Sequence, residues 1–277
     1  MRYRFLSLFC LFYLLTALSF SAATGDGKSD VFLQFTRGSV EIIPPAAERA
    51  YVVPDRDELN QWSEILAHFR AGRYDSAGVI LARYNYSIVH LIDDVTGNTF
   101  DVISERQPIR LGWGTLVYNR GWSRNLNVHV NHPVEDGNIA VIAAEFFRRS
   151  GAKWLLMGGS SKFALGSGNG ADLARAGNSV FHRWHRELSD RMTVSVSLHA
   201  YNPDYYSFPV SASDVVLSNG RTGDDQWGIS QISLTFRDSL RRAGFRTALA
   251  MLDSGFARLA AGYNPQAIFS NDSLGFG

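Results

Sequence analysis

The stretch LNVHVNHPVEDGNIAVIAAEFFRRSGAKWLLM, residues 126–157, places two strand patterns on either side of one helix pattern. Residues 126–130 and 153–157 are short runs dominated by Val, Leu and Trp, which is typical of buried strands. Residues 139–149 between them are largely apolar and long enough for a helix that packs on a sheet. A strand, a helix and a second strand in this order predict that the two strands run parallel.

Strand and helix patterns continue to alternate on both sides of this stretch. Upstream, residues 57–73 repeat apolar side chains at helical spacing, and residues 93–98 join two β-rich runs as the turn of a hairpin. The chain is therefore expected to form an α/β fold with a mixed, mostly parallel sheet and helices on both faces, preceded by an N-terminal helical and β-hairpin segment. The predicted elements are helices at residues 57–73, 76–83, 139–149, 178–188 and 229–242, and strands at residues 88–92, 99–103, 115–118, 126–130, 153–157, 192–199, 214–217 and 245–252.

The N-terminus has the pattern of a secretory signal peptide. Two arginines lie within the first four residues, an apolar run covers residues 5–20, and the small residues Ser-Ala-Ala end at position 23. Residues 1–23 are therefore predicted to be removed on export to the periplasm or the medium; the alternative is an uncleaved anchor, for which the run is short. Residues 24–55 are polar and interrupted by prolines, so an irregular segment is expected there. Residues 56–277 are expected to form a single α/β hydrolase-like domain.

Charge and cysteine content exclude several classes of function. The chain has 27 Lys and Arg against 26 Asp and Glu, and its basic residues are scattered, so nucleic acid is not expected as a partner. The only cysteine, Cys10, lies inside the predicted signal peptide. The mature protein would have no disulfide, no thiolate metal ligand and no cysteine nucleophile. Any zinc site must therefore use His, Asp and Glu.

His132 and Glu135 form an HxxE pair between a predicted strand and a predicted helix. Residues three apart on such a turn can direct an imidazole and a carboxylate at one point. His199 ends a later predicted strand and is the third candidate ligand. Catalytic zinc keeps three protein ligands and an open position for water, whose pKa it lowers to about 7. The same residues also fit a solvated helix start and a core histidine, and the spacing leaves open whether Glu135 or Asp136 reaches the ion.

A hydrolase also needs a general base. No glutamate follows Glu187, so a base late in the chain would be an aspartate. Asp253, at the end of the last predicted strand, and Asp136 are the preferred candidates. Asp214 and the loop at residues 224–225 are alternatives, and all of these aspartates also fit turn positions.

Substrate-binding residues are expected among cations and amides in loops. A cation there would hold a substrate carboxylate, although each cation also fits a solvated surface charge. The candidates are Lys162, Arg175, Arg221, Asn202 and Asn264.

Three other histidines are candidates for metal binding. His129 lies three residues before His132 and is an alternative ligand, although local packing is the preferred interpretation. His182 and His185 lie one helical turn apart, a spacing that can bind metal, but no acidic residue accompanies them. They are therefore expected on a helix surface.

Three segments of the chain resemble the zinc carboxypeptidase and N-formylglutamate amidohydrolase-like superfamily. In order of motifs the resemblance extends over roughly residues 112–271, and its segments are Gly112-Trp113-Gly114-Thr115, Asn131-His132-Pro133-Val134-Glu135-Asp136-Gly137-Asn138 and Ser197-Leu198-His199. In that superfamily an HxxE pair after a strand and a later strand-terminal His bind zinc, a late acidic residue acts as base, and an arginine or asparagine holds the substrate's carboxylate. The resemblance therefore implies His132, Glu135 and His199 as zinc ligands.

The chain departs from this family pattern in several places. The late glutamate of the carboxypeptidases is missing, and the polar loop at residues 263–266 has no arginine. Some related sequences carry their acid at the position of Asp136, which keeps that residue as a candidate ligand. These departures leave room for a pseudoenzyme that retains the fold without turnover.

The sequence thus predicts an exported zinc-dependent hydrolase that cleaves an amide bond in a peptide-like substrate, such as a cell-wall peptide or another acidic peptide. Ester hydrolysis by the same site stays open. The alternative is a noncatalytic envelope protein that binds a partner or glycan, with structural His and Glu residues. Clustering of His132, Glu135 and His199 would favour the enzyme. The sequence makes no prediction of oligomeric state.

Overall fold

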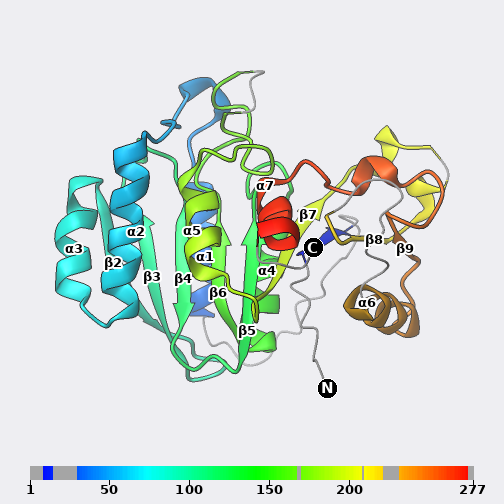
Figure 1. Cartoon of the computed structure of the whole chain (residues 1–277), viewed down its shortest axis with the longest axis horizontal. Helices are drawn as coiled ribbons and strands as arrows, with labels where there is room; N and C mark the ends of the chain where they lie inside the picture. The colour runs from blue at the N-terminus through cyan, green and yellow to red at the C-terminus, as the bar shows by residue number, and fades with distance from the viewer. Residues whose placement is uncertain (1–8, 15–29, 167–169, 208, 221–230, 274–277) are drawn as a thin grey trace.

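The computed structural model describes residues 9–14, 30–166, 170–207, 209–220 and 231–273. Within these residues the strands form one sheet in the order β2-β3-β4-β6-β5-β7-β1-β8-β9 (Figure 1). The strands are β1 (Phe9–Leu14), β2 (Tyr86–Ile92), β3 (Thr99–Glu105), β4 (Thr115–Asn119), β5 (Arg124–Val130), β6 (Ala152–Met157), β7 (Val194–Ala200), β8 (Val215–Ser218) and β9 (Thr247–Leu249).

The sheet is mixed, and this confirms the α/β class. Strand β5 pairs in parallel with both β6 and β7, as the βαβ pattern predicts. Strands β2, β3 and β4 form an antiparallel edge, with a hairpin between β2 and β3 and residues 106–114 between β3 and β4, and β4 also runs antiparallel to β6. Four of the eight neighbouring pairs in the described sheet are antiparallel, so the expectation of a mostly parallel sheet is not confirmed.

Helices cover both faces of the sheet, as expected. Helices α2, α3 and α5 lie on one face and α1 and α4 on the other (Figure 1). Helix α2 begins with a capping box, in which Asp55 and Glu58 each accept the other's backbone N–H at 2.8 Å. None of the described helices is long and apolar enough to cross a membrane. The helices are α1 (Val31–Glu41), α2 (Arg56–Arg70), α3 (Tyr74–Arg83), α4 (Ile139–Ser150), α5 (Val180–Leu188), α6 (Gln231–Arg242) and α7 (Pro265–Ile268).

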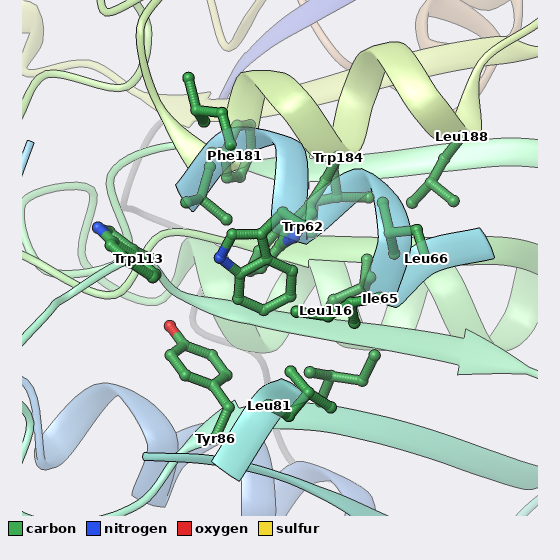
Figure 2. Close-up of a cluster of buried hydrophobic side chains, with 14 of the residues drawn as sticks. Trp62, Ile65, Leu66, Leu81, Tyr86, Trp113, Leu116, Phe181, Trp184 and Leu188 are labelled. Atoms are coloured by element: carbon green, nitrogen blue, oxygen red, sulfur yellow. The ribbon is translucent and has the colours of Figure 1, made fainter. Parts of the chain in front are cut away.

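An aromatic cluster forms the core between the sheet and helices α2, α3 and α5 (Figure 2). Trp62 lies at its centre, with its ring edge-on to those of Tyr86 and Trp184 at centroid distances of 5.2 Å each. Trp62 and Trp184 are each 0% exposed. This packing fixes the helices on the sheet, because large aromatic side chains bury much apolar area and prefer such edge-to-face contacts.

Helix α1 corrects the expectation that residues 24–55 are irregular. Asp30 caps the helix by accepting the backbone N–H of Leu33 at 2.9 Å, and Phe32 packs against Phe100 at a centroid distance of 4.6 Å. Helix α1 contacts α4, and its apolar side chains belong to the core between these two helices and the sheet, on the face opposite the aromatic cluster. The prolines that mark this segment, Pro44, Pro45 and Pro54, all follow the helix and so do not interrupt it.

Strand β1 comes from the apolar run that the sequence predicts to be part of a signal peptide. It pairs in parallel with β7 and antiparallel with β8, in the register Phe9 with Ser195 and Leu14 with Val215. A cut after Ala23 would therefore remove one strand from the interior of the sheet.

Strand β9 is shorter than the predicted strand at residues 245–252. Asp253 accepts the backbone N–H of Leu249 at 2.7 Å, which bends the chain into a turn after three strand residues.

Candidate metal centre

The loop between β5 and α4 brings His132 and Asp136 onto one face of a helical turn. The backbone N–H of Asp136 donates to the carbonyl of His132 at 3.1 Å. Residues four apart on such a turn lie on the same side, and His132 Nδ1 is 3.7 Å from Asp136 Oδ2. This geometry explains why the second carboxylate after His132, and not the first, faces its ring.

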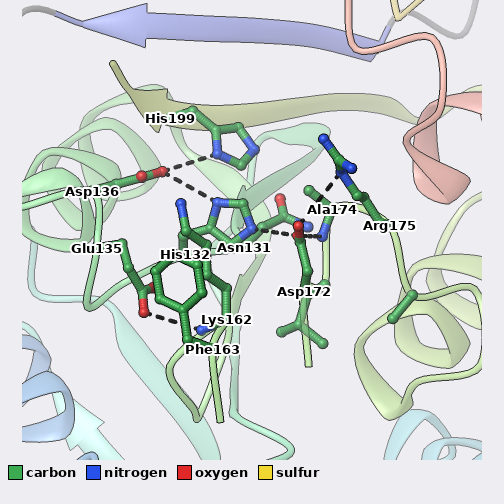
Figure 3. A network of polar contacts seen from close by, with 12 residues as sticks. Asn131, His132, Glu135, Asp136, Lys162, Phe163, Asp172, Ala174, Arg175 and His199 are labelled. Carbon is green, nitrogen blue, oxygen red and sulfur yellow. Dashed lines mark hydrogen bonds and ion pairs between the residues drawn. The ribbon is translucent and has the colours of Figure 1, made fainter. Parts of the chain in front are cut away.

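His199 approaches the same carboxylate from β7. Its Nδ1 lies 2.9 Å from Asp136 Oδ2, and its ring centroid is 4.9 Å from that of His132 (Figure 3). His132, Asp136 and His199 are all buried, and each offers one donor atom within 4.8 Å of the others. The three residues therefore form a group that can hold a metal ion, at the carboxyl ends of two neighbouring parallel strands, where α/β proteins place ligands.

The outer nitrogen of each histidine has its own partner. His132 Nε2 lies 2.8 Å from Asp172 Oδ1, and His199 Nε2 lies 3.2 Å from Ser197 Oγ. When an outer ring nitrogen carries the proton, the inner one keeps its lone pair, which is the arrangement of metal-binding histidines. Both Nδ1 atoms are thus held toward Asp136.

Sequence reasoning did not find Asp172. It lies in the coil between β6 and α5, where its Oδ1 also accepts the backbone N–H of Ala174 at 3.1 Å. The 40 residues that separate it from His132 hide the pairing in the sequence. Only the fold therefore reveals the contact.

Charges in the centre are strongly coupled. Burial alone would lower the pKa of His132, but its hydrogen bonds to Asp136 and Asp172 raise that pKa to about 9. Burial raises the pKa of Asp136, yet the bonds from His132 and His199 outweigh it and lower that pKa. Burial lowers the pKa of His199. Without a metal ion, His132 therefore holds a proton between two carboxylates at neutral pH, and a cation that binds Nδ1 must compete with protons.

Two imidazole nitrogens and one carboxylate oxygen fit a catalytic zinc site. Zinc takes such donors in catalytic sites with three protein ligands and one open position. Imidazole also suits copper, iron and nickel, so the donors indicate a metal site without selecting zinc.

Glu135 lies outside this group. Its Oε1 accepts hydrogen bonds from Ser161 Oγ at 2.5 Å and from the backbone N–H of Lys162 at 3.1 Å (Figure 3). The carboxylate therefore braces the turn after β6, and Asp136 occupies the place that the resemblance assigns to Glu135.

A close approach between β6 and the ligand loop keeps the centre compact. The backbone N–H of Gly158 donates to Val130 O at 2.8 Å, and a Cβ at Gly158 would lie 2.7 Å from the carbonyl oxygen of Asn131. Only glycine fits at this contact, which supports the residue just before His132.

The other predicted site residues have local roles or lie outside the described chain. Asp253 is the turn residue after β9, and Asp214 pairs with Arg246. Asn202 accepts the backbone N–H of Asp204 at 3.0 Å, and Asn264 caps α7 through the N–H of Ala267 at 3.0 Å.

The candidate substrate cations differ in position. Lys162 Nζ lies 5.2 Å from the centroid of the Phe163 ring. The side chain of Arg175 is 63% exposed, and its Nε lies 3.6 Å from Asp172 Oδ2. Arg221 and the loop at residues 224–225 are outside the described residues.

His129, His182 and His185 gather behind the centre, which corrects the expected surface position of His185. The His129 and His185 rings meet at a centroid distance of 5.0 Å, and both are 0% exposed, because the C-terminal segment covers this side of α5. Burial lowers the pKa of His129 to about 3 and that of His182 to about 4. Burial also lowers the pKa of His185, so all three histidines are neutral at pH 7; His129 and His185 lie in the core, whereas His182 is half-buried.

A second acidic group, Asp30, Asp93 and Asp94, also has the spacing for an ion. Arg148, whose side chain is buried, already pairs with Asp30 at 2.8 Å and with Asp93 at 3.2 Å. These ion pairs tie α4 to the start of α1 and to the turn after β2.

No protein-family model matches the chain, and neither a curated protein nor a solved structure matches it. The resemblance to zinc carboxypeptidases and N-formylglutamate amidohydrolases therefore stays a prediction from the three sequence segments.

Proposed function

We propose that this protein is a zinc-dependent hydrolase that cleaves an amide bond in a peptide-like substrate. The observation that carries the proposal is the convergence of His132 Nδ1, His199 Nδ1 and Asp136 Oδ2 on one point, with both outer ring nitrogens hydrogen-bonded. A site for structural zinc would supply four protein ligands. Three protein ligands at the carboxyl ends of β5 and β7 favour a site that leaves one position to a substrate or water.

Each residue of the chain has a defined task in this proposal. His132, Asp136 and His199 would bind the ion, which supplies Lewis acidity toward a carbonyl oxygen when bound. Asp172 keeps the proton of His132 on Nε2, and so keeps Nδ1 available. Arg175, exposed beside Asp172, would hold a carboxylate of the substrate. The exposed guanidinium of Arg175 therefore favours an acidic peptide over a basic one as the substrate.

The metal is tested by mass spectrometry of protein purified without chelator. We expect about one zinc per chain, as three ligands of this kind require. Asp136→Asn should abolish zinc retention, whereas Glu135→Gln, which changes the neighbouring carboxylate in the same way, should keep it. Loss of zinc in Glu135→Gln with retention in Asp136→Asn would return the ligand role to Glu135.

The reaction is tested next, on zinc-loaded protein and a panel of N-acyl amino acids and short peptides with acidic or neutral side chains. Release of free amine by the wild type but not by Asp136→Asn supports an amidohydrolase. Zinc binding without turnover of any amide or ester would favour the noncatalytic alternative.

Export to the envelope is part of the proposal, on the basis of the N-terminal sequence pattern. The intact mass of protein recovered from the periplasm or medium tests it. A mass that begins at residue 24 supports export with cleavage, and then the sheet must close without β1. A mass that includes residues 9–14 would favour the anchored alternative, with β1 in the sheet.

A further inference from the structure

A buried chain of hydrogen bonds leads from His199 to the C-terminal segment, residues 264–271. His199 Nε2 contacts Ser197 Oγ at 3.2 Å, and Ser197 Oγ donates to Asn131 Oδ1 at 2.7 Å. Asn131 Nδ2 then donates to Gln266 Oε1 at 3.4 Å. All four side chains are buried, so water does not offer alternative partners.

One backbone carbonyl fixes the direction of every bond in this chain. Gln266 Nε2 donates to Leu173 O at 3.3 Å, and a carbonyl can only accept. Gln266 Oε1 must then face Asn131 and accept a hydrogen bond from Asn131 Nδ2. Asn131 Oδ1 is then left to accept a hydrogen bond from the Ser197 hydroxyl. Ser197 Oγ is then left to accept a hydrogen bond from His199 Nε2–H, so that once a metal ion takes the place of the proton between Asp136 and His199, the lone pair of Nδ1 faces the ion.

Gln266 also links the segment of His132 to the segment of its partner Asp172. Its side chain bonds Asn131, which precedes His132, and Leu173, which follows Asp172, the partner of His132. Its backbone makes a hydrogen bond with His185. A single glutamine of α7 thus connects the segments of His132 and Asp172, and it reaches His199 through Asn131 and Ser197.

We propose that Gln266 is a positioning residue of the metal centre, so that metal binding and the docking of residues 264–271 stabilise each other. This inference rests on the proposed metal site. Coupling between two binding events is reciprocal: the factor by which the docked segment strengthens metal binding is the factor by which the metal strengthens docking. The C-terminal segment therefore acts as a part of the site that the ligand set alone does not reveal.

Zinc affinity, measured by competition with a chromophoric chelator, tests the first half of the inference. Gln266→Met keeps a similar volume but removes both hydrogen bonds, and we expect it to weaken zinc binding about 10- to 100-fold, the usual effect of losing an outer partner of a ligand. Asn127→Ala is the matched control, because Asn127 is also a buried amide on β5 but bonds Leu188 O and Ser189 at the other end of the strand. It should lower stability and leave zinc affinity unchanged.

The absorption spectrum of the cobalt-substituted protein provides a readout that a general loss of stability would not move. The visible bands should change in Gln266→Met and in Ser197→Ala, which interrupts the chain without touching α7, and should stay as in the wild type in Asn127→Ala. Ser197→Ala also covers the case in which Gln266→Met fails to fold.

Hydrogen exchange tests the reciprocal half. Zinc should slow amide exchange of residues 264–271 in the wild type, and should do so less in Ser197→Ala. Equal zinc affinity and equal cobalt spectra in the wild type, Gln266→Met and Ser197→Ala would overturn this inference alone, as would exchange of residues 264–271 that ignores zinc. A wild-type protein that takes up no zinc would contradict the proposed function and this inference together.

Discussion

The aromatic core around Trp62 and the polar centre around Asp136 are both buried, but they are held together in opposite ways. Trp62 packs against several large rings at once, and removal of any one partner leaves the others in place. Asp136 depends on two specific imidazoles, and each of these depends on one further partner. The core therefore tolerates imprecise geometry, whereas the centre is defined by a few directed bonds.

The largest effect is expected in the aromatic core. Trp62→Ala should lower the free energy of unfolding by about 3–5 kcal/mol, because it leaves a cavity between α2, α5 and the sheet. Urea denaturation measures this change. If the two regions are independent, zinc affinity of the folded variant stays at the wild-type value; a parallel loss of zinc affinity would break the comparison.

The polar centre should respond in the opposite manner. Asp172→Asn keeps the shape of the side chain but removes the charge beside His132 Nε2, and we expect zinc affinity to fall about 10- to 100-fold with little loss of folding stability. Chelator competition and urea denaturation of the same samples check both parts. Unchanged zinc affinity would mean that Asp172 does not orient His132.

Burial of His129 and His185 should make the free energy of unfolding depend on pH. The pKa of His129 in the folded protein is about 3, below the value of about 6.5 in an unfolded chain. Its contribution is thus present above pH 6.5 and is lost as the pH falls toward 3. Between pH 7 and pH 5.5 the loss is about 1 kcal/mol.

Denaturation of the zinc-loaded protein at both pH values measures this effect, with His129→Leu as the comparison. The variant should lose less stability than the wild type over the same interval. An equal loss would show that His129 does not contribute to the acid sensitivity.

The smallest effect is expected at the start of α2, far from both kinds of packing. Asp55→Ala removes the side-chain acceptor of the capping box and should lower the free energy of unfolding by about 1 kcal/mol. Thermal denaturation can resolve it beside Asp57→Ala, a control in the same helical turn that leaves the cap intact. Equal losses in the two variants would count against the cap.

Much of the fold could be read from local patterns. Helix α2 and the strands β2 to β7 follow from apolar spacing, and the hairpin follows from its turn residues. Helix α1 was missed, because prolines and polar residues surround a short apolar face. The predicted hairpin already makes β2 and β3 antiparallel, whereas the antiparallel direction of β4 was not predicted, since strand periodicity is the same in parallel and antiparallel pairs.

The candidate site was predicted only in part. The sequence brought forward His132 and His199, because both follow strand patterns, but it could not choose between Glu135 and Asp136. The choice depends on the turn formed by residues 132–136 and on where β7 places His199.

The sequence by itself determined which segments are apolar and periodic, and therefore the α/β class and the two histidines at strand ends. Only the tertiary structure decided that Asp136 faces both histidines and that Asp172 and Ser197 contact the Nε2 atoms of His132 and His199. It also decided that Gln266 connects the segments of His132 and Asp172. The physical reason is range: periodicity reports on neighbours within a few residues, whereas these bonds join residues that are 40 to 135 positions apart along the chain, except for the short steps within β7 and the ligand turn.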